Sequence, residues 1–297
     1  MPVTTLRTIA EVRAHLDAAR AAGSSVGFVP TMGYLHDGHG SLIRQARAAT
    51  DVVIVSIFVN PLQFAPNEDL DAYPRDLSGD TALADANGAD LVFAPSNAEM
   101  YPEPVRTTVS VGEVSASLEG RTRPTHFDGV ATVVAKLFSI VGSCSAYFGE
   151  KDFQQLAVVR RLVADLSLPV AVVGCPTVRE ADGLAMSSRN AYLSPDDRAA
   201  APVLHRSLQA GLAAVGSGVT DPAAVRAAMA ALVDAEPRCE LDYAEVVDAA
   251  TLAVPDPLHG VLRLLVAARF GGARLIDNVG ATVGATVEAA STEGSAS

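Results

Sequence analysis

The chain has 297 residues, of which 49% are hydrophobic and 19% charged, and this composition is typical of one large globular domain or two ordinary ones. Its formal net charge of -12 argues against a long RNA or DNA partner, because such partners are bound by Lys and Arg side chains that displace counterions. A small anionic ligand stays compatible with this charge, since a local cluster of basic groups outweighs distant, screened carboxylates.

Strand and helix patterns alternate along the first 177 residues. Thr8 is expected to cap a first helix that ends near Gly23. Valine-rich strand patterns cover residues 25–29, 52–59, 91–94, 146–149 and 170–173, and helical patterns cover residues 41–50, 80–87, 130–141 and 154–166. Continuous apolarity indicates strands covered on both faces, and the helices supply the crossovers of a parallel sheet. We therefore predict a doubly wound, Rossmann-like α/β domain over residues 1–177.

The composition changes after Pro176. A polar stretch leads into two Ala-rich helical patterns at residues 195–215 and 222–235, followed by strand patterns at residues 242–247 and 261–269. This order predicts a smaller C-terminal α+β lid domain over residues 178–279. Residues 280–297 are small and polar, which predicts a flexible tail.

Neither a membrane segment nor a disulfide framework is indicated. Apolar runs such as residues 52–59 are far shorter than the roughly 20 residues of a membrane span, and the amino terminus lacks a signal-like segment. The three cysteines Cys144, Cys175 and Cys239 form no Cys-x-x-Cys pair, which also argues against a zinc site. We therefore predict a cytoplasmic protein with reduced thiols.

Four polar segments are expected at one edge of the parallel sheet, where ligands bind outside the carboxyl ends of the strands. The first contains His36 and His39, at a turn from strand to helix where free backbone amides attract phosphate. The others are residues 59–64, 148–155 and 186–189. Each segment alone also fits a turn or a helix cap. Their common position favours a nucleotide site instead.

These segments together resemble the pantothenate synthetase (pantoate–β-alanine ligase) family, which belongs to the nucleotidyltransferase-like enzymes with a His-x-Gly-His motif. The resemblance extends to about residue 279 and rests on Pro30-Thr-Met-Gly33, His36-Asp-Gly-His39, Ser56-Ile-Phe-Val-Asn-Pro61 with Gln63-Phe64, Arg123-Pro-Thr-His-Phe127, Phe148-Gly-Glu-Lys-Asp-Phe-Gln-Gln155 and Met186-Ser-Ser-Arg-Asn190. It implies ATP-dependent condensation of (R)-pantoate with β-alanine through an enzyme-bound pantoyl adenylate, with release of pyrophosphate and AMP. It also implies a homodimer.

The resemblance assigns a role to each matched residue. The catalytic residues would be His39, as proton donor, with His36 and Lys151. The ATP-binding residues would be Met32, Gly33, His36, His39, Gly149, Glu150, Lys151, Asp152, Val178, Met186, Ser187, Ser188 and Arg189, and the substrate-binding residues Met32, Gln63 and Gln155. Cationic donors suit the charge that develops at the α-phosphorus, and glutamine amides suit a hydroxy acid. The serine-arginine segment would be a mobile loop that closes over ATP.

Two departures from the family pattern concern metal binding and packing. Mg²⁺ is expected because the charge of ATP must be reduced before a carboxylate approaches, but its protein ligands are unknown. Asp80 stands where the family commonly has adjacent acidic residues, and it lacks an acidic neighbour. Gly40 follows the second histidine where the family usually has a larger apolar residue, so we expect looser packing there.

Other interpretations stay open. A related nucleotidyltransferase acting on a phosphorylated substrate shares the histidines but needs a basic pocket for the substrate phosphate. A class I aminoacyl-tRNA synthetase is disfavoured by the acidic charge and short length, and a non-catalytic ATP sensor would bind ATP without turnover. Arg123 and His126 fit the β-alanine entrance, a dimer contact or a purely structural role.

Overall fold

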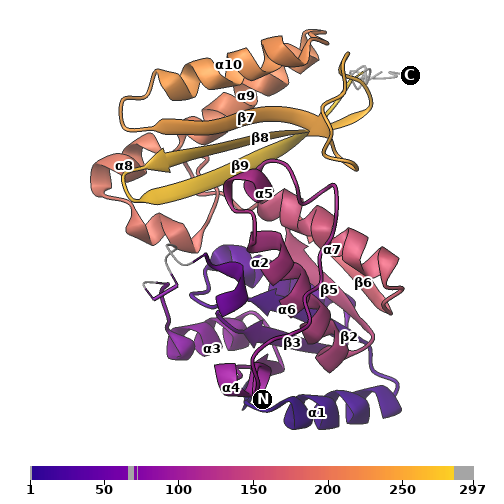
Figure 1. The fold of residues 1–297 in the computed structure, drawn as a ribbon. Coiled ribbons are helices and arrows are strands. Elements are labelled where there is room, and N and C mark those ends of the chain that lie inside the picture. The colour runs from indigo at the N-terminus through magenta and orange to yellow at the C-terminus, as the bar shows by residue number, and fades with distance from the viewer. Residues whose placement is uncertain (1, 66–69, 72, 284–297) are drawn as a thin grey trace, which may run out of the picture.

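The computed structural model describes residues 2–65, 70–71 and 73–283, which form two stacked units (Figure 1). The first unit contains a six-stranded, fully parallel sheet in the order β1-β4-β3-β2-β5-β6. Its strands are β1 (Thr4–Leu6), β2 (Val26–Thr31), β3 (Val52–Ile57), β4 (Leu91–Phe93), β5 (Cys144–Gly149) and β6 (Val170–Cys175). Its helices are α1 (Ile9–Ala21), α2 (Asp37–Ala49), α3 (Leu77–Ala86), α4 (Asn97–Met100), α5 (Glu119–Thr122), α6 (His126–Val141) and α7 (Phe153–Asp165), with the 3₁₀ helices η1 (Pro61–Gln63) and η2 (Glu150–Asp152).

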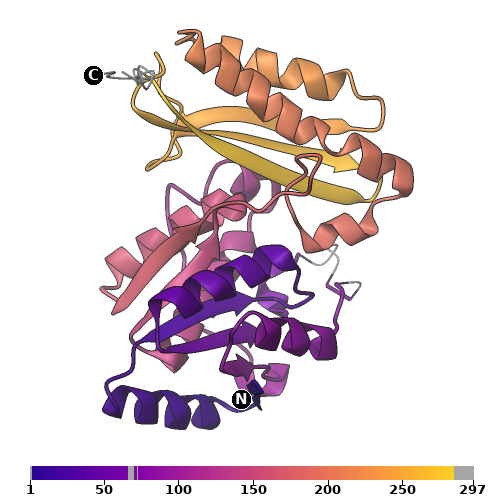
Figure 2. The same cartoon turned by 180° about the vertical axis from the view of Figure 1, so that it is seen from behind.

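Helices cover both faces of this sheet, as predicted. Along β3, Ile54 packs in a core with α1, α6 and α7, whereas Val53 and Val55 pack in a second core with α2 and α3. Figures 1 and 2 show these two helix layers from opposite sides. Because alternate side chains of a strand point to opposite faces, the apolar run buries both sets at once. The doubly wound fold is confirmed.

The strand order reverses between β2 and β5. These two strands pair directly, yet β3 and β4 lie on one side of them and β6 on the other. At such a point the connections leave in opposite directions, and a crevice opens at the carboxyl ends of the strands. The segments that follow β2 and β5 therefore lie next to each other.

The second unit is a three-stranded antiparallel sheet with helices on one face. Its elements are η3 (Ser188–Tyr192), α8 (Pro195–Ala200), α9 (Val203–Gly216), α10 (Pro222–Asp234), β7 (Glu240–Asp248), β8 (Val261–Phe270) and β9 (Ala273–Thr282). Along β8, Leu264 and Val266 pack against α9 and α10, whereas Leu265 and Ala267 belong to the core of the first unit. The sheet therefore rests on the first unit through its other face.

Several elements differ from the predictions, including the short helices α4 and α5, which were not predicted. The single helix expected over residues 195–215 is divided before α9, because Pro202 offers no backbone N–H to continue the hydrogen-bond ladder. The three residues of β1 were missed because so short a strand has no readable period. Strand β9 was also missed, and the predicted tail is wrong for residues 280–282, which end this strand. Residues 284–297 lie outside the described residues.

The looser packing expected at Gly40 is also wrong. A Cβ atom on this buried glycine would lie 2.9 Å from Asn87 Oδ1 and 3.1 Å from Arg44 Nη1. Arg44 donates a hydrogen bond to Asn87 Oδ1, so this pair occupies the volume that a larger side chain would need.

No helix in the described part of the chain is both long and apolar enough to cross a bilayer.

Candidate active site

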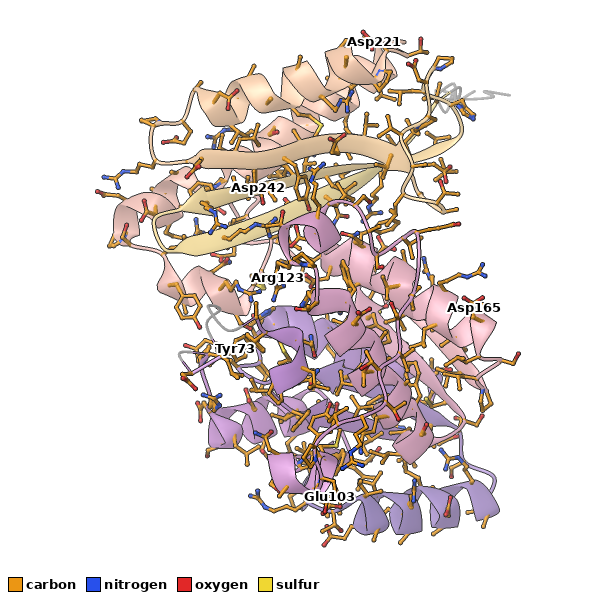
Figure 3. All side chains as sticks on the ribbon, viewed as in Figure 1. Tyr73, Glu103, Arg123, Asp165, Asp221 and Asp242 are labelled. Carbon is orange, nitrogen blue, oxygen red and sulfur yellow. The ribbon has the colours of Figure 1, made fainter. Side chains whose placement is uncertain are left out.

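A cavity of about 790 Å³ lies between the two units, at the carboxyl ends of the parallel strands. Its wall contains most of the predicted site residues: Met32, His36, His39, Gln63, Gly149, Lys151, Asp152, Gln155, Val178, Met186, Ser187, Ser188 and Arg189. Gly33 and Glu150 are not part of this wall. Arg123 does line the cavity, and Figure 3 shows it between the two units. Segments separated by about 150 residues of chain thus face one space.

The two histidines occupy the turn from β2 into α2. His36 caps the helix, and its Nδ1 accepts a hydrogen bond from the Gly38 N–H at 3.1 Å. His39 Nδ1 accepts from the His36 N–H at 3.3 Å, and the two ring centroids are 4.2 Å apart. A neutral imidazole that accepts at Nδ1 carries its proton on Nε2. Each ring therefore has its donor at Nε2.

Both imidazoles are neutral at physiological pH in this structure. Burial, together with the charge of the nearby Lys151 ammonium, lowers the pKa of His36 to about 4. Burial likewise lowers the pKa of His39 to about 3, with a smaller contribution from His36. Desolvation thus disfavours the charged imidazolium in the protein without ATP, while cationic histidine donors in the transition state stay a prediction.

Asp80 fixes the loop that leads to His36. Its buried carboxylate accepts hydrogen bonds from the backbone N–H groups of Tyr34 at 2.9 Å and Leu35 at 2.6 Å. Glycine is favoured at position 33 for two reasons. Its φ of +87° is a backbone conformation that other residues rarely adopt, and a Cβ there would lie only 2.9 Å from Asp80 Oδ2. Burial raises the pKa of Asp80, while the two N–H donors oppose that shift. This carboxylate thus has a structural role.

The described residues contain no group of three or more His, Cys, Asp or Glu that could hold a metal ion. The carboxylates close to the cavity already have partners. Asp80 accepts the two amides above, Glu150 lies 3.2 Å from Arg263, and Asp152 lies 3.5 Å from Lys151. The described part of the protein therefore does not fit a metal site built from side chains.

The short helix η2, directly after β5, carries Lys151 and Asp152 into the cavity wall. Burial works to raise the pKa of Asp152, but the charges of Lys151 and Arg189 outweigh it and hold that pKa below its usual range. Asp152 is therefore ionised at neutral pH and can accept hydrogen bonds from ligand hydroxyl groups.

The serine-arginine segment lies against the histidine turn. Ser188 Oγ donates to the Tyr34 carbonyl at 3.1 Å, and Met186 Cβ lies 3.7 Å from the position of a Cβ on Gly38. Ser187 Oγ accepts from the Arg189 N–H at 3.3 Å. The segment predicted to close over ATP is thus next to His36 and His39 in this structure.

Asn60 orients Gln63 at the end of β3. The Asn60 Nδ2 group donates to Gln63 Oε1 and to the Gly129 carbonyl, both at 3.1 Å, and its Oδ1 accepts from the Tyr101 hydroxyl at 2.9 Å. Because Gln63 Oε1 is engaged, the Nε2 group is the one suited to donate to a ligand. Arg123 donates to the Gln63 carbonyl at 3.2 Å.

The two adjacent glutamines of α7 both line the cavity, but the side-chain amide of Gln154 is already engaged by backbone groups. Gln154 is buried, and its amide bonds to the backbone of Glu119, Val114 and Ser117 at 2.8–3.0 Å. Gln155 lines the cavity, as the sequence predicted. His126 Nδ1 lies 3.1 Å from the Gln63 carbonyl, which indicates a supporting role for this side chain.

Several cavity residues were missed by the sequence reasoning. They include Tyr73, Thr177 and Asn278. Asn60 lies in the predicted polar segment 59–64, but its role of orienting Gln63 without lining the cavity was not predicted. Thr177 lies just after β6, and its buried hydroxyl has no hydrogen-bond partner among the described residues. Its place after a strand is a signal that sequence reasoning had available. Asn278 had no such signal, because it lies inside a strand that was not predicted.

Comparisons with known proteins agree with this architecture. A family model described as pantoate-beta-alanine ligase matches residues 4–280. The pantothenate synthetases of Agrobacterium fabrum and Roseiflexus castenholzii are 51% and 54% identical over 274 and 273 residues, covering 92% of this chain and 94% and 98% of theirs. The crystal structure of pantothenate synthetase from Thermus thermophilus superposes with a TM-score of 0.89 and 52% identity, over 93% of this chain and 99% of that one. The crystal structure of the Francisella tularensis pantoate-beta-alanine ligase, complexed with beta-gamma ATP and beta-alanine, superposes with a TM-score of 0.77 and 33% identity. The match covers 93% of this chain and 97% of that one.

The histidine tautomers are open to direct measurement. At about pH 6 an ordinary imidazole is largely protonated, but we expect His36 and His39 to be neutral with the proton on Nε2. Because their folded pKa values lie below the unfolded value, the unfolded state takes up protons first. Their contribution to the free energy of unfolding is therefore lost as the pH falls from about 6.5 towards 4 for His36 and 3 for His39. Long-range ¹⁵N–¹H NMR spectra of the imidazoles test this, and two protonated nitrogens on either ring at pH 6 would contradict it.

Proposed function

The chain belongs to the pantoate-β-alanine ligase family, and from this premise we propose how its cavity condenses (R)-pantoate with β-alanine at the expense of ATP. In the first step the pantoate carboxylate attacks the α-phosphorus of ATP and displaces pyrophosphate. In the second step the amine of β-alanine attacks the acyl carbon of pantoyl adenylate, forms the amide bond and displaces AMP. The observation that carries the proposal is the convergence of the histidine turn, η2 and the serine-arginine segment on one cavity.

The histidines and Lys151 would stabilise the adenylation transition state. Negative charge builds on the phosphate oxygens as pyrophosphate leaves, and preorganised donors at that position lower the barrier. The Nε2–H groups of His36 and His39 supply neutral donors, while Lys151 and Arg189 supply positive charge. Bound phosphate would raise the pKa of both imidazoles, because an opposite charge favours the protonated form. His39 is the proposed proton donor.

Pantoate would bind at the part of the cavity that contains Met32, Gln63 and Gln155. With its Oε1 engaged by Asn60, Gln63 presents Nε2 to the substrate and so favours a carboxylate or a hydroxyl oxygen. An amide recognises such groups without a charge of its own, which suits a hydroxy acid better than a phosphate ester.

The nucleoside part of ATP would bind to the ends of β5 and β6. Ionised Asp152 can accept hydrogen bonds from the ribose hydroxyls, next to the Gly149 backbone, and Val178 would contact the adenine. Ser187 and Ser188 would reach the phosphates. Gly33 and Glu150, which do not line the cavity, would support the binding segments from behind.

Mg²⁺ is proposed to enter as the complex with ATP, bound by phosphate oxygens. Magnesium commonly keeps several waters and binds through substrate phosphates, and it reduces the charge that pantoate must approach. This agrees with the lack of a side-chain metal cluster among the residues described. A homodimer stays a prediction from the family resemblance, and a cytoplasmic location stays a prediction from the sequence composition.

Pyrophosphate exchange tests the proposed function. Incubated with ATP, Mg²⁺ and labelled pyrophosphate, the protein should incorporate label into ATP when pantoate is present, and it should need no β-alanine. Adenylation is reversible before the amine arrives, so exchange reports this step alone. Exchange only with a phosphorylated alcohol would favour the related nucleotidyltransferase. ATP binding without any exchange would favour the sensor.

Replacing His39 tests the transition-state role. We expect His39→Ala to slow exchange by roughly 10²-fold to 10³-fold, the usual effect of removing one transition-state donor, while the Kd for ATP changes much less. His15→Ala is the matched control, because His15 is exposed on α1 and is not part of the cavity wall. Unchanged exchange in His39→Ala would remove this residue from catalysis.

A charge at position 63 tests pantoate recognition. Gln63→Glu keeps the acceptor for Asn60 but replaces the Nε2 donor with a carboxylate oxygen that repels the pantoate carboxylate. We expect the KM for pantoate to rise about 10-fold to 100-fold, as for a lost hydrogen bond to a charged group, with the KM for ATP little changed. Steady-state kinetics with each substrate varied in turn measures both values. Equal increases in the two would contradict the assignment.

A further inference from the structure

Two polar residues in the middle of β9 are almost fully buried. Asp277 and Asn278 are each 3% exposed, on the edge strand of the second sheet. Figure 1 shows that β9 is the strand of this sheet that lies nearest the first unit. Buried polar side chains are normally satisfied by specific partners, and here those partners belong to η2 and to the hairpin before the serine-arginine segment.

Asn278 holds η2 through its side-chain amide. Its Nδ2 group donates to the carbonyl oxygens of Glu150 at 3.0 Å and Lys151 at 2.6 Å. Its Oδ1 accepts from Arg263 Nε at 2.6 Å. A guanidinium only donates and a carbonyl only accepts, so a single orientation of the amide satisfies all three contacts.

Arg263 fixes this orientation from β8. Its guanidinium lies 4.2 Å from the ring centroid of Phe153, the first residue of α7, and 3.2 Å from Glu150 Oε2. The side chain is 12% exposed, so solvent competes little for these contacts. The turn that carries Lys151 is therefore held by two side chains of the second unit.

Asp277 makes the corresponding contact with the other segment. Its carboxylate forms two hydrogen bonds with Arg179, at 2.6 Å and 2.9 Å, and Arg179 also donates to the Gly183 carbonyl at 3.0 Å. Arg179 and Ala185 pair across the hairpin that leads to Met186. Adjacent residues of one strand thus contact both the lysine turn and the hairpin before the serine-arginine segment.

We propose that Asn278 is a positioning residue that sets the place of the Lys151 ammonium in the adenylation step. The inference rests on the proposed function, because it needs Lys151 to act on the phosphates. A lysine side chain is long and flexible, and η2 is a single 3₁₀ turn with weak hydrogen bonds of its own. Two hydrogen bonds to the backbone at Glu150 and Lys151 fix the base of that side chain, and charge stabilisation depends on such preorganisation.

A double-mutant cycle tests whether Asn278 acts through Lys151. Pyrophosphate exchange at saturating ATP and pantoate is measured for the unsubstituted protein, Asn278→Ala, Lys151→Ala and the double variant. We expect Asn278→Ala to lower exchange about 10-fold to 100-fold, as for a catalytic group displaced by about 1 Å. In the Lys151→Ala background the same change should cost less than about 3-fold, since the group to be positioned is gone.

Two further variants make the cycle decisive. Asn278→Asp has nearly the same shape and keeps the acceptor for Arg263, but it sets a carboxylate oxygen against two carbonyls. It should lose at least as much exchange as Asn278→Ala, and it replaces that variant in the cycle if the alanine protein does not fold. Arg226→Ala removes an ion pair with Glu245 (3.1 Å) inside the second unit and should leave exchange unchanged.

Equal losses in both backgrounds, or no loss from Asn278→Ala, would overturn the positioning role. A large loss in Arg226→Ala would also count against it, because any disturbance of the second unit would then have the same effect. Absence of pantoate-dependent exchange in the unsubstituted protein would instead overturn the proposed function. The two failures are therefore distinguishable.

Discussion

The direct pairing of β2 with β5 is the constraint on which the site depends. Because the strand order reverses there, the turn that carries His36 and the turn that carries Lys151 are forced to be neighbours. Continuous apolar strands make this arrangement stable, since both faces of the sheet are covered by helices. The chemistry then needs only short polar segments after strands that are already fixed in place.

The second unit completes this crevice. Its sheet packs on the first unit through Leu265 and Ala267, and its edge strand β9 reaches η2 and the 179–185 hairpin through buried polar contacts. The apolar contacts hold the units together, and the polar contacts set the position of individual backbone groups. Hydrogen bonds have the directionality that this second task requires.

Local sequence patterns predicted the parts of the site that follow strands. The valine-rich runs, the histidine turn and the Met186-Ser-Ser-Arg189 segment are each readable within a few residues, and they meet in one cavity. The contacts of Asn278 with η2 span 127 and 128 positions of chain, so no local pattern reveals them. The neutral state of the histidines was also unpredictable from sequence, because it follows from burial. The choice of Gln155 over Gln154, which bonds to backbone, came from the family resemblance, because propensity alone does not distinguish two adjacent glutamines.

Two contacts between the units differ in how far they are exposed to solvent. Ser188 contacts the first unit at an exposed position, where its hydroxyl donates to the Tyr34 carbonyl at 3.1 Å and also hydrogen-bonds with Tyr73. Strand β9 instead contacts α5 through the largely buried ion pair between Arg274 and Glu119. Water and dissolved ions therefore reach the serine-arginine segment more readily than they reach the ion pair at β9.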